Sequence, residues 1–118
     1  YYGKMLMDEE QSAWANAVSI VFPNQEDRGT HVNISGVSLT KSSPNKDNAI
    51  KLMNFLSNGL AQKIYAEQNF EYPVKPGVGP SALVASWGSF KSDSLPLIEI
   101  AKYRTLAAKL VDRTGFDN

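Results

Sequence analysis

The chain has 118 residues, enough for one modest globular domain with a hydrophobic core. Twelve basic and twelve acidic side chains give a formal net charge of zero, and the absence of a basic run argues against nucleic acid as the main partner. The chain has no cysteine, which excludes disulfides, zinc–thiolate sites, iron–sulfur clusters and thiol nucleophiles. No stretch approaches the roughly 18 apolar residues that a membrane span requires.

The first forty residues predict one helix followed by two short strands. Good helix formers and an apolar stripe over residues 3–17 favour a helix. The β-branched run at 18–22 is closed by Pro23 and predicts a strand that ends in a turn. Apolar residues alternate in part over 31–40, and their change of face at Gly36 indicates a bulge or bend in a strand.

The middle of the chain predicts two consecutive helices. Apolar residues recur at helical spacing over 49–56 and again over 60–65, so we expect a junction at Gly59. A turn precedes the first of these helices. Either Ser43, with proline at the next position, or Asn45 could cap it.

The last third predicts an edge strand and further helix. Residues 70–74 read as a short strand, and residues 81–87 as one or two helical turns. Ser94 is expected to cap a final helix that runs to Thr114, with Gly115 as its stop. The expected fold class is therefore α/β, helix-rich with a few short strands. Because so few strands do not complete a sheet, the pattern suits part of a larger protein.

Most candidate chemical groups have an ordinary structural explanation. His31 is the single histidine and offers no serine–histidine–acid arrangement. The carboxylates of Asp8, Glu9 and Glu10 are typical of a solvated helix face. If the chain were a hydrolase, these carboxylates or that of Asp27 would be its acids, which is the enzyme alternative.

The tyrosine pair at the start of the chain has two interpretations. Tyr1 and Tyr2 are either half-buried aromatic residues at the entry to a helix or residues with a functional role. Composition alone favours the packing interpretation, and a functional role needs more support than the pair itself gives.

Several blocks of the sequence resemble ferric-iron-binding proteins of bacterial ABC importers. The segment Tyr1-Tyr2-Gly3-Lys4-Met5 resembles the end of a family motif, Asn-Thr-Tyr-Tyr, one variable residue, then Gly-Lys-Met. The resemblance covers nearly the whole chain in the same order. Its other blocks are residues 22–36, 43–49, 61–67, 70–74 and 87–91.

The resemblance implies the two-lobed periplasmic-binding-protein fold, with metal held in the cleft between lobes. This chain would form the C-terminal third. Residues 1–31 would belong to the second lobe, residues 32–78 would return to the first lobe through a hinge strand, and residues 79–118 would be the C-terminal helical segment of the second lobe. Gly29 and Gly36 flank that strand and are the expected hinge, while a loop and a bulge remain the alternative for both.

The resemblance also implies a function without catalysis. The protein would capture Fe(III) in the periplasm through tyrosine phenolates, with or without a synergistic anion, and deliver it to an inner-membrane ABC permease. The missing N-terminal part would supply the remaining ligands. If the motif is aligned on Gly3, Tyr1 is a ligand and Tyr2 is the variable residue; if the spacing is shortened, both are ligands. The alternatives are another metal, a small oxyanion, or an interaction module without metal.

Overall fold

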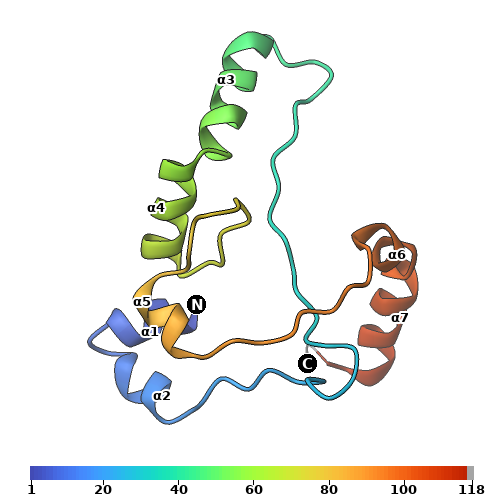
Figure 1. The fold of residues 1–118 in the computed structure, drawn as a ribbon. Helices are drawn as coiled ribbons and strands as arrows, with labels where there is room; N and C mark the ends of the chain where they lie inside the picture. The colour runs from blue at the N-terminus through green and yellow to red at the C-terminus, as the bar shows by residue number, and fades with distance from the viewer. Residues whose placement is uncertain (117–118) are drawn as a thin grey trace. The chain divides into compact units, whose positions relative to one another are not determined.

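The computed structural model describes residues 1–116, and within them the chain is helical with long connecting segments (Figure 1). The helices are α1 (Tyr2–Met7), α2 (Ser12–Asn16), α3 (Lys46–Leu56), α4 (Gly59–Asn69), α5 (Ala82–Ser86), α6 (Leu97–Lys102) and α7 (Arg104–Thr114). None of these helices is long and apolar enough to cross a bilayer.

The chain divides into two compact units. Unit 1 comprises residues 1–22 and 33–90, and unit 2 comprises residues 23–32 and 91–118, of which 117 and 118 lie outside the described residues. These bounds differ from the lobe segments that the resemblance implies. Lobes are defined in a complete protein, so that assignment stays a prediction.

Unit 1 contains helices α1 to α5 and a small buried core. Its buried apolar side chains are those of Ala15, Ala61, Ala66 and Val84. The predicted junction at Gly59 is confirmed, because α3 ends at Leu56 and α4 begins at Gly59. Asn58 caps α4, and its side-chain oxygen accepts a hydrogen bond from the Ala61 amide at 2.9 Å. At the start of α3 the cap residue is Asn45, not Ser43.

The prediction of a single helix over residues 3–17 is wrong, because a turn interrupts this stretch of the chain. One carboxylate oxygen of Asp8 accepts hydrogen bonds from the amides of Glu10 at 3.0 Å and Gln11 at 2.9 Å. Asp8 thereby offers the backbone an alternative to helical bonding. The result is two short helices, α1 and α2.

The strands predicted at 18–22, 31–40 and 70–74 do not form in the described part of the chain. A strand needs a partner for its backbone groups, and the one pairing here is an isolated parallel bridge between Thr30 and Ser92. Residues 33–39 are all exposed, and no backbone hydrogen bond to them is found among the described residues. The helix-rich part of the expectation is confirmed, whereas the α/β class is not reached by this chain alone.

Unit 2 ends in two helices where one was predicted. Helix α6 begins after Pro96 and not after a Ser94 cap, and the helix breaks at Tyr103 before α7. The predicted stop is confirmed: Gly115 adopts the left-handed conformation, with φ of 61°, that glycine reaches without strain.

Candidate functional site

Tyr1 presents its phenol to solvent at the start of α1. It is the N-cap residue of the helix, and its carbonyl oxygen accepts a hydrogen bond from the Met5 amide at 2.9 Å. Its side chain is fully exposed and makes no hydrogen bond within residues 1–116. The backbone of Tyr1 is therefore fixed by the helix while its hydroxyl is exposed to solvent.

Tyr2 is held by unit 1 on two sides. Its hydroxyl donates a hydrogen bond to the Val18 carbonyl oxygen at 3.3 Å. Its ring meets the ring of Trp87 edge-on, with centroids 5.6 Å apart. Edge-to-face pairs of this kind contribute about 1 kcal/mol beyond the area they bury. Tyr2 thus anchors α1 to the segment after α2 and to the end of α5.

Gly3 fixes the packing of α1 against the end of α4. Gly3 is buried, and a Cβ at this position would lie 2.4 Å from Cγ of Phe70. Phe70 itself caps α4 in the left-handed conformation, with φ of 58°. Only glycine allows this approach, so the residue that follows the tyrosine pair determines where the pair is placed.

The carboxylates near the pair do not form a metal centre. Asp8, Glu9 and Glu10 are exposed, and Asp8 is already occupied by the turn between α1 and α2. Within residues 1–116, no group of three histidine, cysteine, aspartate or glutamate side chains could hold an ion together. His31 is exposed as well. A metal site that uses Tyr1 would therefore not be built on such a cluster within the described residues.

The two glycines of the expected hinge lie in different surroundings. Gly29 has φ of +97°, and a Cβ there would lie 2.7 Å from the Lys91 carbonyl oxygen. Gly36 is exposed, and a Cβ there would meet no atom within 4 Å. Gly29 is therefore packed tightly in unit 2, whereas Gly36 in unit 1 is unrestrained.

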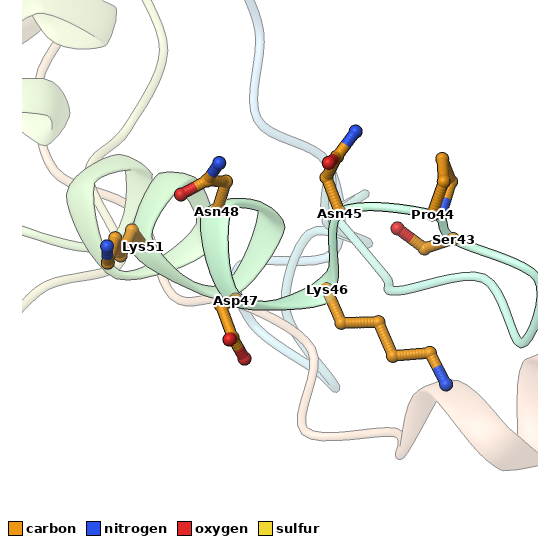
Figure 2. A pocket seen from close by; sticks show the side chains of 7 residues that line it. All are labelled: Ser43, Pro44, Asn45, Lys46, Asp47, Asn48 and Lys51. Atoms are coloured by element: carbon orange, nitrogen blue, oxygen red, sulfur yellow. The ribbon is translucent and has the colours of Figure 1, made fainter.

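A hollow at the start of α3 is open and its side chains diverge (Figure 2). Asn45 and Asn48 point to one side of the helix, and Lys46 and Asp47 to the other. All four side chains are exposed. The residues that line the hollow are Ser43, Pro44, Asn45, Lys46, Asp47, Asn48 and Lys51. Since they converge on no common point, the hollow is not a built ligand site.

The sequence pointed to the tyrosine pair but not to the residues that pack around it and fix its position. Val18, Phe70 and Trp87 are far from the pair along the chain, and each reaches it only through tertiary packing. The one local signal was the glycine directly after the pair. A buried glycine inside a helix commonly marks a close approach of another element.

Comparison with known proteins finds relatives named for iron uptake and for ferric-iron binding. No model of a protein family matches the chain. Iron uptake protein A1 of Synechocystis is 43% identical, over 98% of this chain and 33% of the relative. The crystal structure of apo ferric ion-binding protein A from Pasteurella haemolytica is 58% identical with a TM-score of 0.93, over all of this chain and 37% of that one.

A third relative is a structure with ligands. The Trichodesmium protein IdiA (FutA), in complex with iron and citrate, is 44% identical with a TM-score of 0.87, over 98% of this chain and 37% of that one. The resemblance to ferric-iron-binding proteins found in the sequence is thereby confirmed. The chain spans about a third of the length of the relatives it matches.

Proposed function

We propose that this chain is the C-terminal third of a periplasmic ferric-iron-binding protein, in which Tyr1 supplies a phenolate to Fe(III). The observation that carries the proposal is the 58% identity to apo ferric ion-binding protein A along the whole chain, with a TM-score of 0.93. A free phenol at the start of an anchored helix supports it. The protein would have the two-lobed fold, deliver iron to an ABC-type permease and catalyse no reaction.

The surroundings of the two tyrosines favour Tyr1 as the ligand over Tyr2. The Tyr2 hydroxyl donates a hydrogen bond to the Val18 carbonyl oxygen. A phenolate has no proton and could not make that bond. Coordination by Tyr2 would also have to preserve or replace its contact with Trp87. Tyr1 carries neither constraint. The alignment on Gly3, with Tyr2 at the variable position, agrees with this division of roles.

Phenolate ligands suit a trivalent ion in a cleft. A free phenol has a pKa near 10, and coordination to a trivalent cation favours the deprotonated form. Three phenolates would balance the charge of the ion, which matters where water is partly excluded. Protons compete for the same oxygens, so iron affinity should fall as the pH falls.

The remaining ligands would come from the rest of the protein. The relatives are about three times as long as this chain, and one of them is in complex with iron and citrate. The proposed site accordingly accepts an anion as well as ferric iron. Lobe assignments of 1–31, 32–78 and 79–118 remain part of this proposal.

The test uses the complete protein and ferric citrate. Phenolate-to-iron charge transfer should give a visible absorption band, and Tyr1→Phe should weaken the band and the affinity by at least about tenfold, the equivalent of one charge-assisted bond. Tyr2→Phe should keep the band. Tyr103→Phe, at an exposed position in unit 2, is the matched control.

Three outcomes would contradict the proposal. A colourless wild-type protein that binds another metal or an oxyanion would favour a different cargo. Full colour in Tyr1→Phe would remove Tyr1 from the ligand set. Loss of folding in Tyr1→Phe, seen by circular dichroism, would favour a packing role and an interaction module.

A further inference from the structure

We propose that Trp87 is a positioning residue for the iron ligand Tyr1. Its ring holds Tyr2, and the placement of Tyr2 sets the direction in which α1 presents the Tyr1 phenol. The inference rests on the proposed function, since it assigns a residue that acts on the same site through another side chain. All three residues belong to unit 1, so the contacts concerned are internal to one compact unit.

The Tyr1 side chain depends on the rest of α1 for its direction. It is fully exposed, and within residues 1–116 its hydroxyl makes no hydrogen bond. Its carbonyl oxygen accepts a hydrogen bond from the Met5 amide at 2.9 Å, which ties its backbone to the first turn of the helix. A side chain tied only through its backbone points where its helix directs it. The residues that pack α1 against unit 1 therefore orient the phenol.

The two residues after Tyr1 provide this packing. Tyr2 and Gly3 face different parts of unit 1, because successive residues of an α-helix project about 100° apart. Gly3 lies so close to Phe70 that a Cβ would be 2.4 Å from its Cγ, which fixes how near the helix approaches. A glycine has no side chain that resists rotation of the helix about its axis. The Tyr2 ring, with its centroid 5.6 Å from that of Trp87, supplies this resistance.

Trp87 is the firmer of the two partners of Tyr2. The hydrogen bond from the Tyr2 hydroxyl to the Val18 carbonyl oxygen is 3.3 Å long, against roughly 2.7 Å for a typical hydroxyl donor. Val18 is also exposed, whereas Trp87 is half-buried. The edge-on ring contact thus restrains Tyr2 more than the long hydrogen bond does.

The core of unit 1 fixes Trp87 in turn. Trp87 ends α5, and its amide donates to the Val84 carbonyl oxygen at 3.2 Å. Val84 is fully buried, and the hydroxyl of the buried Ser81 caps the same helix by accepting a hydrogen bond from the Val84 amide at 3.3 Å. Directly after Trp87 the chain turns away at Gly88, with φ of +92°. The Trp87 ring therefore stands at the end of a helix whose middle lies in the core.

The test measures the absorption band of the complete protein with ferric citrate. Trp87→Ala should shift the maximum of the phenolate-to-iron band and lower the iron affinity by up to about tenfold, the equivalent of one aromatic pair. Trp87→Phe should restore both, because the smaller ring still offers Tyr2 an aromatic contact. A residue that served stability alone would lower the melting temperature without moving the band of the folded protein.

Trp14 offers a matched control in the same unit. It is the second tryptophan of the chain and is 65% exposed on α2. Among residues 1–116, the aromatic pairs do not include it. Trp14→Ala should leave the band and the affinity unchanged. An unchanged band in Trp87→Ala, or equal shifts in Trp87→Ala and Trp14→Ala, would overturn the proposal.

A double variant checks that Trp87 acts through Tyr2. Tyr2→Leu removes the ring from the other side of the contact and should shift the band as Trp87→Ala does. Because both substitutions break one contact, Tyr2→Leu combined with Trp87→Ala should shift the band no further than either alone. Additive shifts would mean that Trp87 acts by another route, and would refute its positioning role.

A measurement without iron separates this inference from the proposed function. The Met5 amide reports on the start of α1, because it bonds the Tyr1 carbonyl oxygen. Trp87→Ala should raise hydrogen exchange of this amide by up to about tenfold, and Trp14→Ala should not. Unchanged exchange in Trp87→Ala would refute the inference alone. A wild-type protein without a band would refute iron ligation, and with it the role of Trp87 in iron binding.

Trp87→Leu covers the case in which Trp87→Ala does not fold. Leucine keeps apolar bulk at the end of α5 but presents no ring to Tyr2. It should shift the band in the same direction by a smaller amount, with circular dichroism showing that the variant is folded. A wild-type band in folded Trp87→Leu would count against the proposal.

Discussion

Unit 1 and unit 2 are stabilised by different interactions. Unit 1 buries Ala15, Ala61, Ala66 and Val84, a small apolar core supplied by α2, α4 and α5. Among the described residues of unit 2 only Gly29 is buried, and hydrogen bonds between the Gln25 side chain and the Lys91 backbone connect its segments. A core made largely of alanine buries little apolar area, and burial contributes only about 25 cal/mol per Å².

This difference indicates that both units rely on surface outside the chain. Large apolar side chains of α6 and α7 are exposed, namely those of Leu97, Ile98, Leu106 and Leu110. The extended segment in unit 1 exposes Ile34, Val37 and Leu39 as well. Exposed apolar side chains in such numbers are typical of surfaces that another part of a protein covers. The share of the relatives that this chain does not span would provide the cover.

The largest expected effect is therefore on the 118-residue chain when it is produced alone. It should self-associate and bind an apolar dye such as anilinonaphthalene sulfonate, because its exposed apolar side chains have no partner. Light scattering and dye fluorescence measure both effects. The complete protein is the control and should do neither. A monodisperse, dye-free monomer that unfolds cooperatively would show that the two units suffice by themselves.

A smaller effect separates the packed glycine of unit 2 from the unrestrained glycine of unit 1. Gly29→Ala in the complete protein should lower the free energy of unfolding by about 3 kcal/mol, from the positive φ and the clash with Lys91 and Ser92. Gly36→Ala should change it by less than about 1 kcal/mol, with stabilisation the expected sign. Denaturant unfolding measures both.

The pair of glycine variants also tests the hinge expectation. If Gly29 were a freely rotating hinge, Gly29→Ala would alter opening and closing while leaving unfolding nearly unchanged. A cost below that of Gly36→Ala would contradict the tight packing found at Gly29.

Features that depend on neighbouring residues were predictable from the sequence. The junction at Gly59, the short helix after Ser81 and the stop at Gly115 were all found, because caps and glycine conformations are decided within a few residues. The expected strands were not formed, because a strand exists only with its partner. That partner would lie beyond this chain in the relatives.

The candidate site also combines features that neighbouring residues decide with features that only distant residues decide. Tyr1 and Tyr2 could be singled out by type and position, but their different surroundings could not. Tyr2 is committed to Val18 and Trp87, which only folding brings near it. The hydrogen bonds between Gln25 and Lys91 had no sequence signal either, because these two residues lie far apart along the chain and only folding brings them together.

The smallest predicted effect compares two asparagine caps within unit 1. Asn58 accepts the Ala61 amide with its side chain, whereas Asn45 caps α3 without a side-chain hydrogen bond. Asn58→Ala should therefore lower the free energy of unfolding by about 1 kcal/mol. Asn45→Ala should cost only a few tenths, within the range of ordinary surface substitutions of about 0.5 kcal/mol.

Thermal unfolding of the complete protein measures the difference between the two caps. Asn58→Asp is an informative third variant, because its carboxylate keeps the acceptor and adds a favourable charge at the helix N-terminus. It should restore most of the stability that Asn58→Ala loses. Equal costs for Asn58→Ala and Asn45→Ala would mean that the bond to Ala61 contributes nothing, and that α4 is positioned by its buried alanines alone.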